Sequence, residues 1–402
     1  MRARLTGLAA ALVLVMAGPG VAGAVTTPAA AGAGWTAQHV PMPAGGQNAN
    51  AIAVSCPSAG DCVLVGGYGT ASASPPLAEG WTGHAWTPQT VPVPAGALNT
   101  GLTAVSCVSA TQCMAVGGYV HGTGFGTQSF LSEQRAGGTW TAQTAIPLPA
   151  GGTGGSLTGI SCVSASSCTA VGGYGTAGGL RAPVAEHWNG HAWALERIPV
   201  PGNATRRSDL SAVACTSADS CLAVGSYALK AHPDVYKLLI EHGNGHAWTL
   251  MSAPLPAAAI KGGALDAISC PSVADCTAAG LYWPANTLDS YNLAEHWNGS
   301  TWVVQSTPSP GTTHELADVL TGISCASASS CTAVGTSVAR GAVERPVGEY
   351  WNGSAWAVQQ TAKPKQAVGP EGVSCASATT CTAVGNLATK GDATVLPFAE
   401  HK

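Results

Sequence analysis

The chain has 402 residues, of which 16 are basic and 20 acidic, so its formal net charge is −4. Charged residues are only 9% of the chain and form no basic run, which argues against nucleic acid as a partner. Gly and Pro are frequent, but 12 Trp and 46% apolar residues are enough to build a core, so a disordered chain is not expected.

Residues 1–24 have the pattern of a secretory signal peptide. Arg2 and Arg4 precede an apolar run over residues 5–17, and small residues at 22–24 offer a cleavage site. The run is too short to span a bilayer, and no later stretch reaches about 18 apolar residues. We therefore predict a secreted, extracellular protein without a membrane span, with residues 25–402 as its single folded domain.

From residue 50 onwards the chain consists of repeats marked by paired cysteines. Each pair encloses five residues, and successive pairs start 50 to 55 residues apart. A period of this length is typical of propeller blades. The pairs are Cys56/Cys62, Cys107/Cys113, Cys162/Cys168, Cys215/Cys221, Cys270/Cys276, Cys325/Cys331 and Cys375/Cys381.

One repeat, residues 157–202, divides into four short apolar segments separated by turn residues. They cover 157–162, 168–174, 182–188 and 192–199, with Asn189-Gly190 as a hairpin signal between the last two. Helical periodicity is absent, because Gly or Pro interrupts every window. Four antiparallel strands per repeat predict a propeller blade and an all-β fold.

The two chain ends suggest that the repeats close into a ring. The last repeat stops at residues 398–402, which is its third strand, and a fourth-strand sequence occurs instead at residues 32–45, around Trp35. An N-terminal strand that completes the last blade leaves no free edge. We therefore predict seven blades, at about 50–98, 99–152, 153–205, 206–260, 261–314, 315–366, and 367–402 together with 32–45.

The cysteine pairs are predicted to form one disulfide in each blade. They flank the turn between the first and second strands, where opposed Cα atoms lie close enough for a bridge. Metal binding asks for closer Cys-x2-Cys pairs, and redox catalysis for one reactive thiol, so we expect no metal and no cofactor.

Two further residues recur in all blades and are expected to be structural. The fourth-strand Trp is predicted to fill the core between blades rather than to form an exposed sugar-stacking stripe. A Glu near the end of each third strand, such as Glu186, is expected to make a repeated hydrogen bond. The His that follows it in four blades points to the other face and cannot bind the same metal ion.

Several short motifs resemble those of known propeller families. Gly299, Thr301 and Trp302 match part of the Asp-box of sialidase-type (BNR) propellers, although Trp297 stands where the Asp belongs. Gly66-Gly67-Tyr68 resembles the kelch double glycine, which occurs in three repeats. The whole mature chain is similar to secreted actinobacterial repeat proteins with Ser-Cys-x-Ser-Ala-x-x-Cys and Trp-Asn-Gly-x-x-Trp motifs, a resemblance that implies the fold but no defined activity.

Candidate functional residues lie on the irregular loops at one face. These are the connections from the second to the third strand and from one blade to the next, and such loops commonly carry function. The richest are residues 227–237 and 282–291, whose aromatic residues could form a platform for a sugar. The candidate ligand-binding residues are His121, Arg181, His232, Tyr236, Tyr282, Trp283, Tyr291, Arg340 and Arg345.

Two function classes remain open. The first is a non-catalytic, monomeric binding or scaffold module for an extracellular glycan or protein. The second is a carbohydrate-active enzyme, a glycoside hydrolase or lyase with a sialidase-like fold. Hydrolysis requires two suitably spaced carboxyl groups, and the candidates Asp234, Asp289 and Glu344 are linked by no local motif. The binding module is favoured, without a catalytic residue.

Overall fold

The computed structural model describes residues 34–121, 128–143, 146–284, 289–308, 315–339, 343–362, 367–388 and 394–402. Within these ranges the chain forms β-strands, turns and loops and no helix, so it also contains no helix that could cross a membrane. The all-β prediction is confirmed. The predicted signal peptide, residues 1–24, lies outside the described residues.

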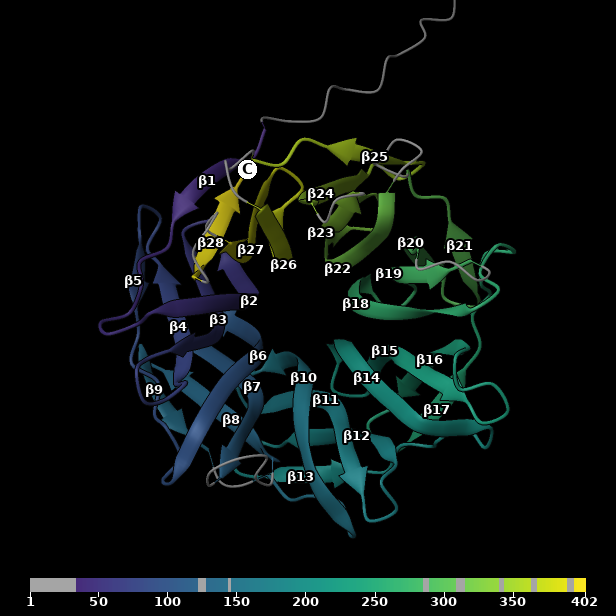
Figure 1. The fold of residues 1–402 in the computed structure, drawn as a ribbon, viewed down its shortest axis with the longest axis horizontal. Helices are drawn as coiled ribbons and strands as arrows, with labels where there is room; N and C mark the ends of the chain where they lie inside the picture. The colour runs from purple at the N-terminus through teal and green to yellow at the C-terminus, as the bar shows by residue number, and fades with distance from the viewer. Residues whose placement is uncertain are drawn as a thin grey trace, which may run out of the picture. The chain divides into compact units, whose positions relative to one another are not determined.

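The strands form seven four-stranded groups, here called sheets 1 to 7 (Figure 1). Sheet 1 has β2 (Asn48–Ser58), β3 (Asp61–Gly69), β4 (Pro76–Trp81) and β5 (Trp86–Pro88). Sheet 2 has β6 (Ala97–Ser109), β7 (Gln112–His121), β8 (Gln128–Ala136) and β9 (Thr139–Ala142). Sheet 3 has β10 (Gly152–Ser164), β11 (Ser167–Thr176), β12 (Arg181–Trp188) and β13 (Trp193–Glu196). Sheet 4 has β14 (Ala204–Ser217), β15 (Ser220–Leu229), β16 (Tyr236–Gly243) and β17 (Trp248–Met251).

The remaining sheets follow the same plan. Sheet 5 has β18 (Gly262–Ser272), β19 (Asp275–Trp283), β20 (Tyr291–Trp297) and β21 (Trp302–Gln305). Sheet 6 has β22 (Glu315–Ser327), β23 (Ser330–Ala339), β24 (Val343–Trp351) and β25 (Trp356–Gln359). Sheet 7 has β26 (Ala367–Ser377), β27 (Thr380–Ala388), β28 (Val395–His401) and the N-terminal β1 (Thr36–His39).

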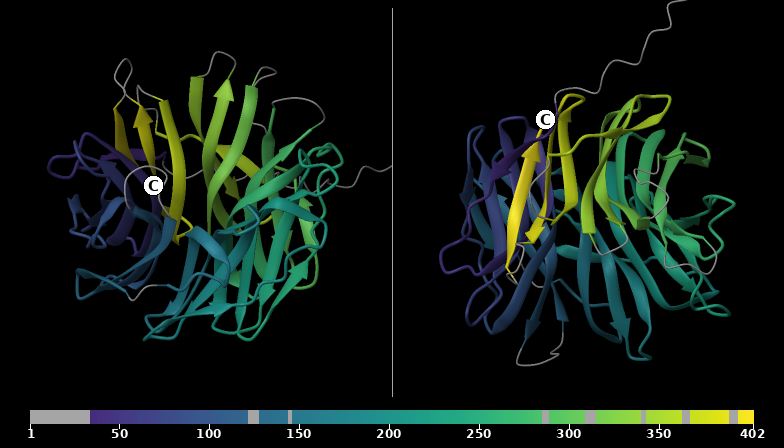
Figure 2. Two further views of the ribbon diagram at one scale, coloured as in Figure 1. Left: turned by 60° about the horizontal axis from the view of Figure 1, so that its bottom comes forward. Right: turned by 45° about the horizontal axis from the view of Figure 1, so that its top comes forward.

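In every sheet the strands pair antiparallel in this order, and the first strand lies nearest the centre of the arrangement (Figures 1 and 2). The N-terminal strand β1 pairs with β28 over four residues, from Thr36 opposite His401 to His39 opposite Phe398, as the repeat pattern predicted. Sheets 4 and 5 are additionally joined by a single parallel bridge between Tyr236 and Gly262.

The strand lengths differ from the sequence-based boundaries. The first strand of sheet 3 begins at Gly152, five residues earlier than predicted, because it continues beyond a β-bulge into the polar loop region. The turn after β12 contains four residues, since Trp188 pairs with Trp193. Its shape is held by the Asn189 side-chain oxygen, which accepts bonds from the N–H groups of His191 and Ala192, both at 3.0 Å.

All seven predicted disulfides are present, and no cysteine of the described ranges is free. Each bridge joins residues six apart across the turn between the first and second strands, with Cα atoms 3.9–4.1 Å apart. The bridges are Cys56–Cys62, Cys107–Cys113, Cys162–Cys168, Cys215–Cys221, Cys270–Cys276, Cys325–Cys331 and Cys375–Cys381.

Each bridge is local to one hairpin, as predicted, and the second cysteine also contacts a neighbouring sheet. Cys62 and Cys331 are buried, at 3% and 1% exposure, and their sulfur atoms contact the preceding sheet. Cys62 Sγ lies 3.7 Å from Thr382 Oγ1, and Cys331 Sγ lies 3.9 Å from Thr277 Oγ1. The Thr hydroxyl is the donor, since a disulfide sulfur carries no hydrogen. The bridges at Cys62 and Cys331 therefore also belong to the packing between sheets.

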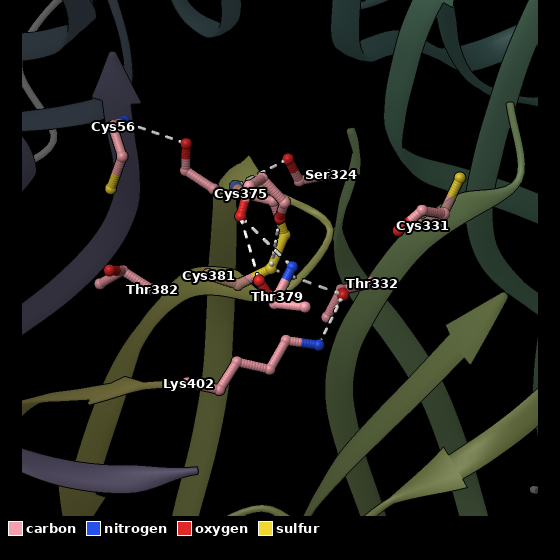
Figure 3. Close-up of a disulfide and its surroundings, with 12 residues drawn as sticks. Cys56, Ser324, Cys331, Thr332, Cys375, Thr379, Cys381, Thr382 and Lys402 are labelled. Carbon is pink, nitrogen blue, oxygen red and sulfur yellow. Dashed lines mark hydrogen bonds between the residues drawn. A yellow bond between two sulfur atoms is a disulfide. The ribbon is translucent and has the colours of Figure 1, made fainter. Parts of the chain in front are cut away.

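The first cysteine takes part in a regular hydrogen bond between sheets. Figure 3 shows the Cys375–Cys381 bridge together with Ser324 of the preceding sheet, whose hydroxyl accepts a bond from the Cys375 N–H at 2.9 Å. This is one of six equivalent bonds, in each of which the Ser before the first cysteine of one sheet accepts from the first cysteine of the next, at 2.9–3.0 Å. One of them connects Ser374 of sheet 7 with Cys56 of sheet 1, residues 318 positions apart. The bonds therefore link sheets that are adjacent in the chain and also its first and last sheets.

A second set of bonds links the outer strands. The fourth-strand Trp of one sheet donates its indole N–H to the side chain three residues after the equivalent Trp of the preceding sheet. This occurs for Trp86 to Gln38, Trp140 to Gln89, Trp248 to Glu196 and Trp356 to Gln305, at 2.6–2.9 Å. All seven of these Trp side chains are buried, at 3–7% exposure, which confirms them as core residues.

The recurring third-strand glutamates are fully buried, with 0% exposure. The prediction of one repeated hydrogen bond is wrong for most of them, because five have no hydrogen-bond partner for either carboxyl oxygen within the described structure. Glu349 accepts from Asn292 Nδ2 at 2.7 Å and Glu400 from the Ala362 N–H at 2.8 Å. Burial raises the pKa of Glu295 to about 8, and the same holds for Glu79, Glu133, Glu186 and Glu241.

Candidate functional site

The two ends of the strands differ in character. One end, here called the disulfide end, carries the seven cysteine turns and the turns between third and fourth strands. The opposite end, here called the loop end, carries the longer connections, and the sequence analysis placed the candidate residues there. The structure describes all of these residues except Arg340.

Four predicted aromatic residues lie at the loop end of sheets 4 and 5 as two ring pairs, and we call them the aromatic patch. The rings of Tyr236 and Trp283 have centroids 5.3 Å apart, and those of Tyr282 and Tyr291 are stacked at 5.5 Å. Tyr282 and Trp283 are consecutive in β19, so the two pairs share one strand end, and their side chains leave the strand on opposite faces. Tyr291 is 36% exposed and the other three side chains are half-buried.

The backbone explains why these rings come together. Tyr282 is directly opposite Tyr291 in the β19–β20 ladder, so their side chains are cross-strand neighbours. Gly262 pairs with Trp283 on one side and bridges to Tyr236 on the other. Gly262 has a φ of +88°, and a Cβ there would lie 1.6 Å from the Tyr236 carbonyl oxygen. Only glycine therefore permits this approach of the two sheets.

Charged groups flank the aromatic patch. Arg207 donates a hydrogen bond to the Tyr236 hydroxyl at 2.9 Å. Lys261 forms an ion pair with Asp234, and the pKa of that exposed carboxyl is lowered mainly by its hydrogen bond to Lys261. Burial, with a smaller contribution from Tyr291, raises the pKa of the Tyr282 hydroxyl, which keeps it a neutral hydrogen-bond donor. The patch thus combines ring faces with polar donors.

The other predicted ligand-binding residues are spread over the loop end. His121 packs edge-on against Tyr119 in sheet 2, with ring centroids 4.8 Å apart. Arg181 forms an ion pair with Asp209 between sheets 3 and 4. His232 is exposed in the loop between β15 and β16 of sheet 4, four residues before Tyr236, and Arg345 is exposed in β24 of sheet 6. Arg340 lies outside the described residues. Among the predicted residues that the structure describes, the ring contacts between two of them are the two pairs of the aromatic patch.

Sequence reasoning missed two carboxyl groups on innermost strands. Asp266 of β18 has its pKa raised to about 6 by burial. Glu371 of β26 has its pKa raised by burial and by the negative charges of Glu344 and Asp266. Both occupy the position four residues before a cysteine, where the other repeats have Ile, Thr or Ser. That departure was visible in the sequence. No group of three or more metal-ligating side chains occurs within the described ranges.

The disulfide end, which the repeat pattern suggested to be uniform, contains pockets between sheets. Their volumes are about 370 Å³ between sheets 4 and 5, 210 Å³ between sheets 1 and 2, and 30 Å³ between sheets 2 and 3. The turns follow the same sequence pattern, but the pockets between the sheets differ in volume, because side chains at equivalent positions of the repeats differ.

Comparison with known proteins supports the fold. No model of a known protein family matches the chain, and no curated protein is detectably similar to it in sequence. The GH74 xyloglucanase from Xanthomonas campestris superposes with a TM-score of 0.52 and 12% identity over 90% of this chain. The present chain covers 55% of that enzyme. A protein of unknown function from Dyadobacter fermentans superposes with a TM-score of 0.51 and 10% identity, covering 92% of this chain and 97% of that one.

At such low identity these matches define the class of fold alone, and that class is consistent with a β-propeller. The all-β sheets, the disulfide in each repeat and the propeller-like neighbours agree with one another.

Proposed function

We propose that residues 25–402 form a secreted, monomeric, closed seven-bladed β-propeller that binds an extracellular glycan through the aromatic patch, without catalysis. The observation that carries this proposal is the presence of two ring pairs, Tyr236 with Trp283 and Tyr282 with Tyr291, at one strand end. Ring closure is supported by the β1–β28 pairing and by the Ser374–Cys56 bond. Export is supported by the seven disulfides, which persist in oxidising compartments.

The chemistry of the patch favours a sugar as ligand. Aromatic rings offer large apolar faces on which the C–H face of a pyranose can stack, while Tyr hydroxyls remain available at the ring edge. The Arg207 guanidinium donates to the Tyr236 hydroxyl, and the Lys261 ammonium pairs with Asp234, two residues before Tyr236. Both groups can donate to hydroxyl or carboxylate oxygens. A protein ligand would use the same rings, so the experiment below separates the two.

A carbohydrate-active enzyme is the second candidate. Its carboxyl groups would be Asp266 and Glu371, since both have raised pKa values and Asp266 acts electrostatically on Glu371. A raised pKa suits a general acid. At the aromatic patch, however, Asp234 is ion-paired and its pKa is lowered, which does not suit a proton donor. Binding is therefore favoured at this site.

The proposal is tested by depletion of the purified protein from solution by insoluble polysaccharides, including xyloglucan-coated cellulose and chitin, with released sugars quantified. We expect depletion without sugar release, and at least a tenfold loss of affinity in Trp283→Ala and Tyr291→Ala. Tyr119→Ala is the matched control, because it removes an aromatic side chain from the loop end of sheet 2. Release of sugar would favour the enzyme. Failure to bind any polysaccharide would refute the glycan proposal and leave a protein ligand.

A further inference from the structure

The pocket between sheets 4 and 5 lies at the disulfide end, opposite the aromatic patch. It is lined by side chains of both sheets, including Thr216, Ser220, His242 and Thr249 from sheet 4 and Trp297 from sheet 5. The aromatic patch begins at Tyr236, the first residue of β16, and His242 is six residues further along that strand. At about 3.3 Å per residue the two places are roughly 20 Å apart. They are therefore separate sites.

Two departures from the repeat coincide at this interface. Ala214 stands where the other six repeats have the Ser that accepts from the next cysteine N–H, so this bond to Cys270 is missing. Met251 stands where the other repeats have a Gln or Glu three residues after the fourth-strand Trp. Both Ala214 and Met251 line the pocket. The space thus forms where both inter-sheet hydrogen bonds have been lost.

The loss of the Gln also leaves a buried donor in the core of this interface. The Trp302 side chain is 4% exposed, and its Nε1 has no hydrogen-bond partner within the described structure, whereas the equivalent Trp356 donates to Gln305 at 2.8 Å. Met251 and Trp297, which line the pocket, belong to the same core cluster as Trp302, which does not line it. The interface beside the pocket is therefore less fully hydrogen-bonded than the one between sheets 5 and 6.

The remaining lining groups match a small polyhydroxylated ring. Trp297 provides an aromatic wall that is held in place, because its Nε1 donates to the Val273 carbonyl at 3.2 Å and its ring packs 5.8 Å from that of Trp302. Three hydroxyl groups and the His242 imidazole provide donors and acceptors on the facing sheet. A volume of about 370 Å³ lies within the range of small-molecule sites, about 300–1,000 Å³.

Interfaces that keep the repeated Ser and Gln residues have smaller pockets than the one between sheets 4 and 5. Between sheets 1 and 2 both bonds are kept, Ser55 to Cys107 and Gln89 to Trp140, and the opposite wall is Arg135 instead of a Trp. The pocket there has about 210 Å³. Between sheets 2 and 3, where Ser106 keeps its bond to Cys162, the pocket has about 30 Å³.

We propose that the pocket between sheets 4 and 5 is a second carbohydrate site, which takes a single pyranose ring between Trp297 and the hydroxyl groups of sheet 4. It shares no residue with the aromatic patch, so this proposal does not depend on the function proposed for that patch. Its ligand is a terminal or free sugar, since a pocket closed on two sides by sheets admits a ring more readily than a long chain.

The test is saturation-transfer NMR with the full mature protein and a panel of free hexoses and N-acetylhexosamines. The decisive variant is Thr249→Trp, which fills the pocket from an exposed position on the outer strand β17. The matched control is Val303→Trp, the equivalent position of sheet 5, which is 40% exposed. A second variant, Trp297→Ala, removes the aromatic wall, and unchanged circular dichroism and thermal midpoint confirm that each variant is folded.

The pocket variants are compared in a Trp283→Ala background, which disables the aromatic patch. In this background we expect saturation transfer to at least one sugar, a loss of at least tenfold when Thr249→Trp or Trp297→Ala is added, and no loss when Val303→Trp is added. Absence of transfer to every sugar would overturn the proposal, and so would transfer in this background that survives the addition of Thr249→Trp. Transfer lost in Trp283→Ala but kept in Thr249→Trp would assign the binding to the aromatic patch and refute the second site.

Discussion

The indole N–H of Trp302 has no acceptor in the described structure, and Met251 stands at the position where other sheets supply one. Met251 supplies no acceptor, whereas Gln89 and Gln305 accept from Trp140 and Trp356 at the equivalent positions. We predict that Met251→Gln stabilises the protein by about 1 kcal/mol, because it satisfies a buried donor at the expense of one partly buried methionine. The measurement is the urea midpoint of the purified protein.

The matched control for this prediction is Gln305→Met, which creates the same unsatisfied donor at the next interface. It is expected to lower the urea midpoint by an amount similar to the gain in Met251→Gln. If both variants moved the midpoint in the same direction, the indole hydrogen bond would not be the cause.

A second prediction at this scale concerns the glycine of the second strand, which all seven repeats contain. A Cβ at Gly117 would lie 2.0 Å from the carbonyl oxygen of Gly101, and the equivalent distances in the other sheets are 1.8–2.2 Å. Gly117→Ala should therefore destabilise by about 2–4 kcal/mol, since backbone atoms cannot yield as a flexible side chain does. Gly101→Ala is the control, because no atom lies within 4 Å of its added Cβ. Thermal midpoints of the two variants should differ clearly.

At the scale of the element, most strands and all the disulfides could be predicted from the sequence, because cysteine spacing and turn residues are local signals. The six-residue spacing of Cys162 and Cys168 across a turn, and the Asn189-Gly190 turn before Trp193, identified the strands and the disulfides. The start of β10 at Gly152 could not be predicted, since its extension depends on a bulge and on neighbouring sheets. The contact of Tyr236 with Trp283 depends on the Tyr236–Gly262 bridge, which is a pairing between repeats that no local pattern encodes.

We predict that each disulfide stabilises the hairpin formed by the first two strands of its sheet. Removing the Cys215–Cys221 bridge in a Cys215→Ala/Cys221→Ala variant frees a small loop in the unfolded chain and should cost about 2 kcal/mol. The variant should fold, because the β14–β15 ladder continues well beyond the bridge. A lower urea midpoint with an unchanged circular dichroism spectrum is the expected result. An unchanged midpoint would show that the hairpin needs no covalent closure.

At the scale of the whole molecule, the seven buried glutamates act together because each sheet contributes one. The recurrence of these glutamates is visible in the sequence, but the lack of a hydrogen-bond partner for five of them depends on packing between sheets, which only the structure shows. Burial raises the pKa to about 8 for five of them and to about 7 for Glu349 and Glu400. The folded protein therefore holds these protons at a pH at which the unfolded chain has released them.

The direction of the pH dependence follows from proton binding. Below a pH of about 4.5 the glutamates are protonated in both states, so they cause no penalty. Between about 4.5 and 8 the unfolded chain gains free energy by ionising while the folded protein does not, so stability falls as the pH rises. We expect the thermal midpoint to decrease by about 5 °C or more from pH 4.5 to pH 8.5.

Substitution of a single glutamate tests whether these carboxyl groups cause the effect. Glu295→Gln removes one titrating proton from a side chain with 0% exposure, so it should leave stability at pH 4.5 nearly unchanged and raise it at pH 8.5 by about 1–2 kcal/mol. Asp219→Asn, at an exposed carboxylate, is the control and should not alter the pH slope. A midpoint that rose between pH 4.5 and pH 8.5, or a slope unaffected by Glu295→Gln, would show that the buried glutamates are ionised in the folded protein. Among the described residues, Asn292 donates to Glu349 and the Ala362 N–H donates to Glu400, while the other five carboxyl groups have no donor, so ionisation of those five would leave buried charges without a hydrogen bond.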